Sequence, residues 1–472
     1  VIKQVFEDSN PYMKSGTLML GVIEKLNDSI HFNDFTTRHN LGNIYEQILN
    51  DLRAAGNAGE FYTPRAITRV MVDLIDPQLS KKETVMDPAC GTGGFLTAAI
   101  SHFHNQVDDQ NNDIEKKTIE QLIFGIEKKQ LPHLLCTTNM LLHGIDVPSQ
   151  IDHGNTLARP WNDWRENESV DCVITNPPFG GLEDNEVGSD YPVDIRTRET
   201  ADMFLALIVE KLLKPNGRAA LVLPDSALFG EGVKYKIKKL LMDKCNLHTI
   251  VRLPKGVFSP YTSISSNILF FTKGRPTETI WYYEHTYPEG RKSYSKTNPI
   301  LYEEFEAEKS WWGKEQDDFA SRIEHQYAWK VDFKAKKEKA ESLAATYWEK
   351  ARELNIKISK KEKQLQKLKT NTKDSSLRKG TELADADISK IRNEIDNLRI
   401  QSKDAQAAGD RIFWPIYNLD AKNPHTPEVE VQDPQILLNK YKNLLSELTK
   451  TQDKLKKELS KALAYNSGRL DN

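Results

Sequence analysis

The sequence of 472 residues contains little cysteine, no long apolar run and no excess of positive charge. Its four cysteines, Cys90, Cys136, Cys172 and Cys245, show no CxxC spacing, so they indicate neither a zinc site nor a disulfide framework. We interpret them as buried thiols in a reducing cytoplasm. No stretch approaches the roughly 18 apolar residues of a spanning helix, which excludes a multi-span membrane protein. The formal net charge is -3, so any contact with nucleic acid requires a local basic patch or a partner.

The length predicts about three domains, since a domain averages roughly 150 residues. Residues 1–58 form a predicted helical region, because their apolar residues recur at helical spacing. No signal peptide is visible and the first residue is Val1 rather than Met, so we expect N-terminal sequence to be missing. Residues 59–310 form the predicted central domain, and residues 311–472 form a predicted helical region for subunit assembly.

Short apolar runs alternate with helical patterns in the central part of the chain. Such alternation is typical of a mostly parallel sheet that is covered by helices on both faces. The polar segment at residues 105–113 is expected to be an exposed loop. The fold class that follows is α/β, with a doubly wound, mostly parallel sheet flanked by N-terminal and C-terminal helical regions. The six predicted strands are Thr84–Met86, Leu122–Ile126, Val170–Thr175, Ala219–Leu223, Leu247–Arg252 and Asn267–Thr272.

Three apolar runs with heptad-like spacing occur in the C-terminal region. They predict long amphipathic helices with narrow apolar seams, which suit coiled-coil packing. The pattern leaves open whether the seams pair within the chain as a hairpin, dock onto a partner subunit, or do both. The segment Ile356–Lys379 carries nine basic and two acidic residues, and it is either a solvated helix face or a nucleic-acid contact. The three runs extend from Ala344 to Leu368, from Ile388 to Leu398 and from Tyr441 to Leu459.

The first chemical motif is the glycine-rich segment Asp87–Leu96, which follows one predicted strand and precedes a helical pattern. Glycines let the backbone turn sharply and approach a ligand closely. In such nucleotide sites an acidic residue at the end of the next strand holds ribose hydroxyls. Glu127 has this position, although its spacing exceeds the usual value of about 20 residues. No GK[ST] follows the glycines, so a phosphate-binding P-loop is not indicated.

The second motif is Asn176-Pro177-Pro178-Phe179, directly after a predicted strand, where open α/β sheets bind ligands. The exocyclic amine of a nucleobase is a poor nucleophile because its lone pair is delocalised into the ring. Hydrogen bonds accepted by the Asn176 side-chain oxygen and the Pro177 carbonyl would localise that lone pair. Phe179 offers an apolar face on which an extruded base can stack. Attack on a methyl group carried by a sulfonium then needs positioning, without a metal or a covalent intermediate.

The segments AGEFYTPR, DPACGTGGFL and NPPFGG, in this order, resemble those of the modification (M) subunit of type I restriction–modification systems. The resemblance covers residues 40–275 closely and the helical C-terminal region in character only. It implies a Rossmann-like methyltransferase core that depends on S-adenosylmethionine. It also implies methylation of adenine N6 in DNA by a site-specific enzyme. The N-terminal region is shorter than in this family, which agrees with the expected missing sequence.

The resemblance also assigns roles to individual residues, and none of these residues is a metal ligand. The catalytic residues are Asn176, Pro177 and Phe179, and the base-stacking residues are Phe179 and Phe258, with Tyr261 competing for the role of Phe258. The cofactor-binding residues are Phe61 and Thr63 at the methionine end, Asp87, Gly91 and Gly93 in the main loop, Glu127 at the ribose, and Asn155 near the adenine.

The family works with partners, so the resemblance implies them for this chain. They are DNA, one specificity (S) subunit, a second M subunit and a restriction (R) subunit, with no membrane involved. The S subunit reads the DNA target and contributes long helices. The heptads that follow Ala344 are therefore candidates for docking onto those helices.

Alternatives to adenine methylation remain open at this point. Similar motifs serve the methylation of cytosine N4 and of the protein glutamine amide. The type I signature and the long helical tail favour adenine. A catalytically silent assembly scaffold is a further alternative, against which the intact Asn176, Pro177, Phe179 and Glu127 argue.

Overall fold

The computed structural model describes residues 14–29, 41, 63–107, 117–146, 148–259, 262, 264–295, 297–374, 381–426 and 434–467. The chain divides into two compact units, Val1–Asn423 and Pro424–Asn472. All four cysteines are buried and free, as the sequence predicted. Phe61 and Tyr261, both named from the sequence, lie outside the described residues.

A single mixed sheet of nine strands, in the order β3-β2-β1-β4-β5-β7-β6-β8-β9, organises the described part of the first unit. Neighbouring strands from β3 to β5 are parallel, β7 is antiparallel between β5 and β6, and β9 is antiparallel to β8. The mostly parallel sheet that the sequence predicted is therefore confirmed. The strands are β1 (Val85–Asp87), β2 (Ile123–Glu127), β3 (Ile151–His153), β4 (Val170–Thr175), β5 (Leu213–Pro224), β6 (Cys245–Arg252), β7 (Ser266–Lys273), β8 (Thr279–Glu284) and β9 (Ala328–Asp332).

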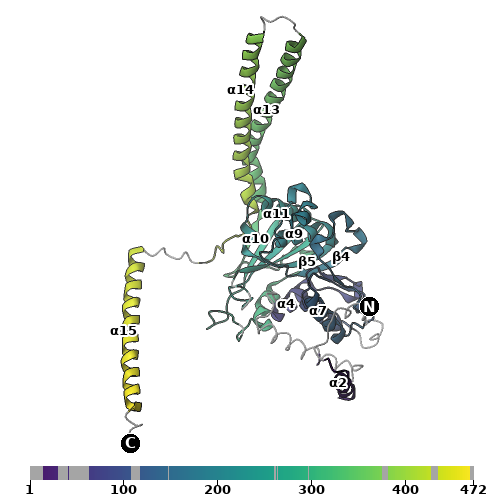
Figure 1. The fold of residues 1–472 in the computed structure, drawn as a ribbon, viewed down its shortest axis with the longest axis vertical. Coiled ribbons are helices and arrows are strands. Elements are labelled where there is room, and N and C mark those ends of the chain that lie inside the picture. Colours follow the sequence, from purple (N-terminus) through teal and green to yellow (C-terminus); the bar gives the residue numbers. More distant parts are fainter. Residues whose placement is uncertain are drawn as a thin grey trace. The chain divides into compact units, whose positions relative to one another are not determined.

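Helices cover both faces of this sheet, as Figure 1 shows for α4 and α7 on one side and α9 and α11 on the other. The strands supply both cores because successive side chains point to opposite faces. In β5, Leu221 and Leu223 pack in one core, whereas Ala220 and Val222 pack in the other. The covering helices are α4 (Arg65–Ile75), α5 (Gly94–His104) and α7 (Gln130–Leu142) on one face, and α9 (Thr200–Leu207), continued by a π-helical turn (Ile208–Leu212), and α11 (Val233–Lys244) on the other. Shorter helices are α8 (Asn185–Ser189), α10 (Asp225–Phe229) and α12 (Glu306–Trp311).

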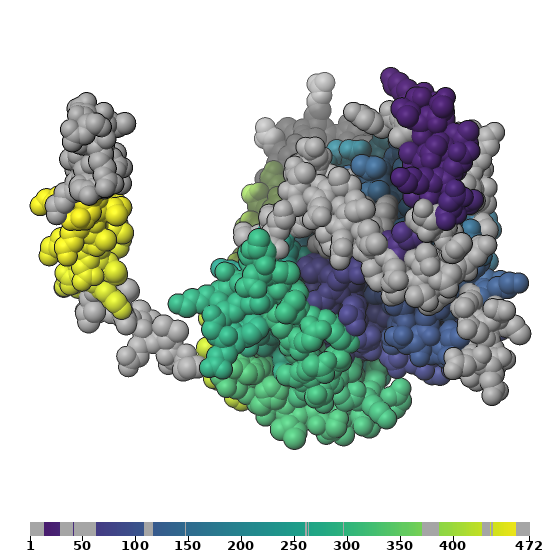
Figure 2. Space-filling view, turned by 90° about the horizontal axis from the view of Figure 1, so that it is seen from below, coloured from purple at the N-terminus to yellow at the C-terminus, as the bar shows by residue number. Residues whose placement is uncertain are grey.

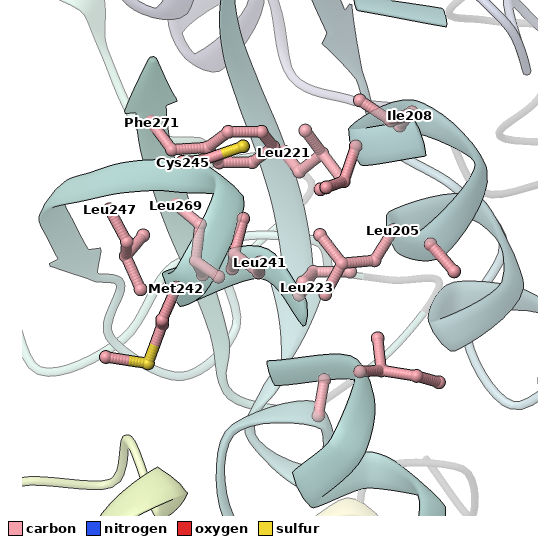
Figure 3. Close-up of a cluster of buried hydrophobic side chains, with 14 of the residues drawn as sticks. Leu205, Ile208, Leu221, Leu223, Leu241, Met242, Cys245, Leu247, Leu269 and Phe271 are labelled. Carbon is pink, nitrogen blue, oxygen red and sulfur yellow. The ribbon is translucent and has the colours of Figure 1, made fainter. Parts of the chain in front are cut away.

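Figure 3 shows how tightly one of these cores is filled. Side chains from α9, α11 and three adjacent strands meet with almost no solvent exposure. Burial of each large aliphatic side chain stabilises the fold by roughly 1.5–3 kcal/mol, so this layer is a major source of stability. The labelled residues are Leu205, Ile208, Leu221, Leu223, Leu241, Met242, Cys245, Leu247, Leu269 and Phe271.

The segment near residue 300 packs against α4, on the face of the sheet that α4, α5 and α7 cover. The ring of Tyr302, in the turn η7 (Tyr302–Phe305), lies 4.1 Å from the Arg69 guanidinium carbon, and its hydroxyl donates a hydrogen bond to Asp73. Figure 2 shows the green segment around η7 beside the violet-blue segment that contains α4. Residues far apart in the chain thus join α4 to the segment between β8 and β9.

The six predicted strands are all present, but three strands escaped prediction. β3 has three residues, of which only one is apolar, while β8 has six residues and β9 has five. β9 lies beyond residue 310, where the sequence placed the end of the central domain, and it pairs with β8 within the sheet. The sheet therefore extends into the region that was expected to be purely helical.

Two of the three long C-terminal helices pair within the chain. α13 (Phe333–Asp374) and α14 (Thr381–Phe413) run antiparallel in Figure 1. Ala351 and Ile395 are buried between them, and the Ser402 hydroxyl donates to the Ala351 carbonyl at 3.2 Å. At the surface, Arg399 forms an ion pair with Glu362 at 2.7 Å. The first two heptad runs thus form an intramolecular hairpin, one of the possibilities left open by the sequence.

Two further helices carry exposed apolar residues. In α2 (Gly16–Ser29), the only long described stretch of residues 1–58, Leu18 and Ile23 are more than half exposed. The second unit contains α15 (Pro434–Ser467), whose apolar run includes the exposed Tyr441 and Leu448. Among the helices described here, none combines the length and the apolar character that crossing a bilayer requires.

Gly409 offers a test of the hairpin packing. A Cβ atom at this position of α14 would lie 2.5 Å from Nε1 of Trp348, whose indole also donates to Asp410 at 3.0 Å. We expect Gly409→Ala to lower the free energy of unfolding by about 1–3 kcal/mol, since the ring must move to admit the methyl group. Thermal unfolding followed by circular dichroism measures this.

The matched control is Gly21→Ala in α2, where a Cβ atom meets nothing within 4 Å. Alanine is the better helix former by roughly 0.5–1 kcal/mol, so the control should leave stability unchanged or slightly raised. A Gly409→Ala protein as stable as the wild type would contradict the proposed contact.

Candidate active site

Three parallel strands end at the same edge of the sheet. β1 pairs with β2 on one side and with β4 on the other, and both pairs are parallel. Their carboxyl ends carry Asp87, Glu127 and Asn176. Ligands of open α/β sheets bind at this edge, so these residues mark the candidate site.

The glycine-rich loop turns sharply from β1 into α5. Gly91 and Gly93 have φ angles of 55° and 85°, in the left-handed region that favours glycine. A Cβ atom on Gly93 would lie 2.8 Å from Sγ of Cys136 and 3.0 Å from Cε of Met140. Close packing of the loop against α7 therefore requires glycine at position 93.

Glu127, the last residue of β2, forms a hydrogen bond with this loop. One carboxylate oxygen accepts a hydrogen bond from the Gly91 backbone N–H at 2.9 Å, and the other accepts from the Lys129 N–H at 2.7 Å. Each carboxylate oxygen retains further acceptor capacity. The geometry thus fixes the carboxylate beside the loop and leaves lone pairs for the hydroxyls of a ligand.

Asp87 is the buried acid of the site, with 1% of its surface exposed. Its Oδ1 atom accepts hydrogen bonds from the Thr175 hydroxyl at 2.6 Å and from the Ala89 N–H at 3.0 Å. Burial raises the pKa of the Asp87 carboxyl to about 7, and the charge of Glu127 adds to the rise, while the two hydrogen bonds oppose it. Asp87 therefore joins the ends of β1 and β4 from inside the protein.

Asn155 is held by contacts that the sequence did not reveal. Its Oδ1 caps the turn η2 (Thr156–Ala158) by accepting from the Leu157 N–H, and its Nδ2 donates to Glu183 at 3.1 Å. Lys128, next to Glu127, also reaches Glu183, at 3.2 Å. Glu183 is thus a member of the site that sequence reasoning missed, because it lies in a loop after the second motif with no pattern around it.

Asn176 and Thr63 meet although 113 residues separate them. The Nδ2 group of Asn176 donates to the Thr63 hydroxyl at 2.8 Å. The Oδ1 atom of Asn176 is buried and has no hydrogen-bond partner among the residues that the structure describes. A buried acceptor without a partner is costly, so this atom is available to an N–H or O–H donor of a ligand.

Aromatic side chains lie next to this acceptor in the chain and in space. Phe179 is 9% exposed, and its ring packs edge-on against Phe258 with centroids 6.2 Å apart and planes at 80°. Pro177, between Asn176 and Phe179 in the motif, is buried. The structure therefore brings Phe258 to the second motif, where the sequence expected it.

The arrangement combines three chemical features. A backbone loop and a carboxylate suit a nucleoside-like ligand, an unpaired amide oxygen suits an N–H donor, and two phenyl rings suit a flat apolar group. Hydrogen bonds join Thr63 to Asn176, Gly91 to Glu127 and Thr175 to Asp87, and so connect the ends of β1, β2 and β4.

Comparisons with known proteins agree with this picture. A family model described as N-6 DNA Methylase matches residues 36–357. The type I restriction enzyme EcoEI methylase subunit of Escherichia coli is 61% identical over 331 residues, covering 70% of this chain and 66% of that protein. The EcoKI methylase subunit of Escherichia coli strain K12 is 31% identical over 340 residues, covering 66% of this chain and 62% of that protein. The chain thus spans slightly less than two thirds of the length of these relatives.

Two solved structures are similar over most of the chain. A crystal structure described as that of a modification subunit of a type I restriction enzyme from Vibrio vulnificus YJ016 has 45% identity and a TM-score of 0.63, covering 70% of this chain and 67% of that one. A chain from a structure that addresses the assembly and conformational transition of the type I R-M system has 29% identity and a TM-score of 0.65, covering 97% of this chain and 79% of that one.

The raised pKa of Asp87 predicts a pH dependence of stability. Between the ordinary carboxyl pKa of 3.8 and the folded value of about 7, folded Asp87 keeps a proton that the unfolded chain has released. The free energy of unfolding of the wild type therefore falls as pH rises through this window. Asp87→Asn removes the titration and retains an acceptor oxygen for both hydrogen bonds. We expect the variant to gain stability relative to the wild type from pH 4 to above pH 7, by on the order of 4 kcal/mol.

Urea unfolding at several pH values measures this difference. The control is Asp163→Asn, an exposed aspartate, which should follow the wild type across the range. Parallel curves for the wild type and Asp87→Asn would show that burial does not hold the proton on Asp87.

Proposed function

The chain belongs to the N-6 DNA methylase family, and from this premise we propose that it transfers a methyl group from S-adenosylmethionine to N6 of adenine in DNA. In this proposal it is the modification subunit of a type I restriction–modification system. The observation that carries the proposal is the buried Oδ1 atom of Asn176, an acceptor without a partner among the described residues at the carboxyl end of β4.

The residues at the edge of the sheet fit S-adenosylmethionine. The positive φ angles of Gly91 and Gly93 give the loop its sharp turn, and a side chain at position 93 would collide with Cys136. Glu127 is oriented by two backbone N–H groups to accept from the ribose hydroxyls. When bound, S-adenosylmethionine supplies a methyl group on a positively charged sulfonium, which is a good leaving group. Phe61, Thr63, Asp87 and Asn155 complete the set that we assign to this site.

Asn176 and Pro177 carry the chemistry that we propose for the target base. The Asn176 Oδ1 atom and the Pro177 carbonyl accept hydrogen bonds from the two N–H groups of the adenine amine. These bonds draw the nitrogen toward a tetrahedral geometry and localise its lone pair for attack on the methyl group. The gain is greatest when positive charge develops on the nitrogen, so the contacts favour the transition state over the ground state.

Phe179 and Phe258 provide a place for the base outside the duplex. An enzyme that modifies a base must extrude it from the stack, and aromatic faces compensate part of the lost stacking. The edge-on contact between the two rings, with centroids 6.2 Å apart, holds Phe179 in a defined orientation. We therefore assign Phe179 to direct stacking and Phe258 to its support and to the second contact with the base.

Sequence recognition and assembly are assigned to partners. With a net charge of -3, the chain lacks the overall positive charge of a protein that binds DNA tightly by itself. In α15, exposed apolar residues recur at heptad-like spacing, which suits packing against another helix. We propose that a specificity subunit selects the target, that two modification subunits join it, and that a restriction subunit completes the complex. The α15 residues are Leu438, Tyr441, Leu445, Leu448 and Leu455.

The identity of the product tests the proposed function. Plasmid DNA is incubated with S-adenosylmethionine and the chain co-purified with its specificity subunit, and the nucleosides are analysed by mass spectrometry. We expect N6-methyladenine, and none when S-adenosylmethionine is left out. N4-methylcytosine in its place would reassign the target base, and unmodified DNA would favour a scaffold without catalysis.

The variant Asn176→Ala tests the catalytic role that we propose for the Asn176 side chain. We expect kcat to fall by about 100-fold or more, since an interaction that strengthens in the transition state is lost. Affinity for S-adenosylmethionine, measured by calorimetry, should stay near the wild-type value. Asn162→Ala, at an exposed asparagine, is the control and should retain full activity. Near wild-type transfer by Asn176→Ala would remove the proposed role of this side chain.

A further inference from the structure

Thr63 stands directly before the first helix of the core and contacts the second motif. It is followed by Pro64, the N-cap residue of α4, whose rigid ring fixes the local backbone. The Thr63 hydroxyl accepts the hydrogen bond from Nδ2 of Asn176 at 2.8 Å. α4 itself packs in the sheet core through Ile67 and Met71, which are fully buried. The hydroxyl is thus presented to Asn176 from a firmly anchored segment.

An asparagine amide has two chemically different ends, and only one suits the proposed reaction. The oxygen accepts hydrogen bonds, whereas the nitrogen only donates them. The target amine presents N–H groups and therefore needs the amide oxygen as acceptor. If the amide were rotated, these N–H groups would face the Nδ2 donor instead. In the structure Nδ2 is engaged by Thr63, and Oδ1 is the end without a partner among the described residues.

We propose that Thr63 is a positioning residue for Asn176: its hydroxyl fixes the plane of the amide, and in the structure it accepts from Nδ2 and leaves Oδ1 for the target amine. This role is additional to the cofactor contact that the family resemblance suggests for position 63. The inference rests on the proposed adenine methylation, because the orientation of the amide matters only if an N–H donor is the substrate. Thr63 acts before the base arrives, so the amide loses little orientational freedom when the complex forms.

The experiment compares Thr63→Val, which removes the hydroxyl and keeps the shape, with Thr63→Ser, which keeps the hydroxyl. All variants are full-length and co-purified with the specificity subunit, and methyl transfer to plasmid DNA is followed at saturating S-adenosylmethionine. We expect kcat of Thr63→Val to fall by about tenfold to 100-fold, the range that follows from misplacing a reacting group by about 1 Å. Thr63→Ser should stay within about threefold of the wild type.

The control is Thr68→Val in α4, which makes the same chemical change nearby. The Thr68 hydroxyl donates to the Arg65 carbonyl within the helix, so its loss should leave kcat unchanged. The dissociation constant for S-adenosylmethionine is measured by calorimetry for every variant. A rise of this constant in Thr63→Val reports the cofactor contact assigned to position 63, whereas a fall of kcat at saturating S-adenosylmethionine reports the positioning role.

A double variant shows whether Thr63 affects kcat through Asn176 or independently of it. If Thr63 works by orienting the amide, Thr63→Val should cause no further loss of kcat in an Asn176→Ala background. A further tenfold loss there would overturn the proposal, as would an unchanged kcat in Thr63→Val, an equal loss in Thr63→Ser, or a defect confined to cofactor affinity.

The wild-type reaction distinguishes this proposal from the proposed function. A wild-type complex that forms N6-methyladenine, together with a fully active Thr63→Val, overturns the role of Thr63 alone. A wild-type complex that forms no methylated adenine overturns both.

Discussion

The parallel pairing of β1 with β2 and β4 is the constraint on which the site depends. Because neighbouring parallel strands end at the same edge, Asp87, Glu127 and Asn176 come together from three distant parts of the chain. Hydrogen bonds then link the strand ends directly, from Gly91 to Glu127 and from Thr175 to Asp87. The loop that crosses this edge is therefore fixed by its own glycines together with these hydrogen bonds.

This edge retains polar groups that a purely structural sheet would avoid. Asp87 is almost completely buried, and Oδ1 of Asn176 has no partner among the described residues. Each such group costs about 1–3 kcal/mol when its needs are unmet. The two apolar cores on the faces of the sheet, with residues such as Leu221 and Val222, supply the stability that offsets this cost. Polar groups of this kind at the ligand-binding edge of a sheet are typical of a functional site.

The long helices show how similar patterns lead to different outcomes. The apolar seams of α13 and α14 pack against each other, which buries residues such as Ala351 and Ile395. The seam of α15 retains exposed leucines in its own unit. An amphipathic helix is stabilised chiefly by burial of its apolar face, so the exposed seam is the one that supports our proposal of a partner. The near-neutral net charge agrees with a subunit that leaves target recognition to another chain.

By itself, the amino-acid sequence determined the fold class, six of the strands, and the placement of Asp87, Glu127 and Asn176 at strand ends. These features are local, because apolar runs and glycine spacing appear within a few residues. The roles assigned to the site residues remain predictions. Only the tertiary structure decided the order of the strands, the addition of the short strands β3, β8 and β9, and the pairing of α13 with α14. It alone brought Glu183 to Asn155 and Thr63 to Asn176. Those contacts join residues far apart in the chain, and a contact of that kind leaves no periodicity in the sequence, because it depends on how the layers pack around the sheet.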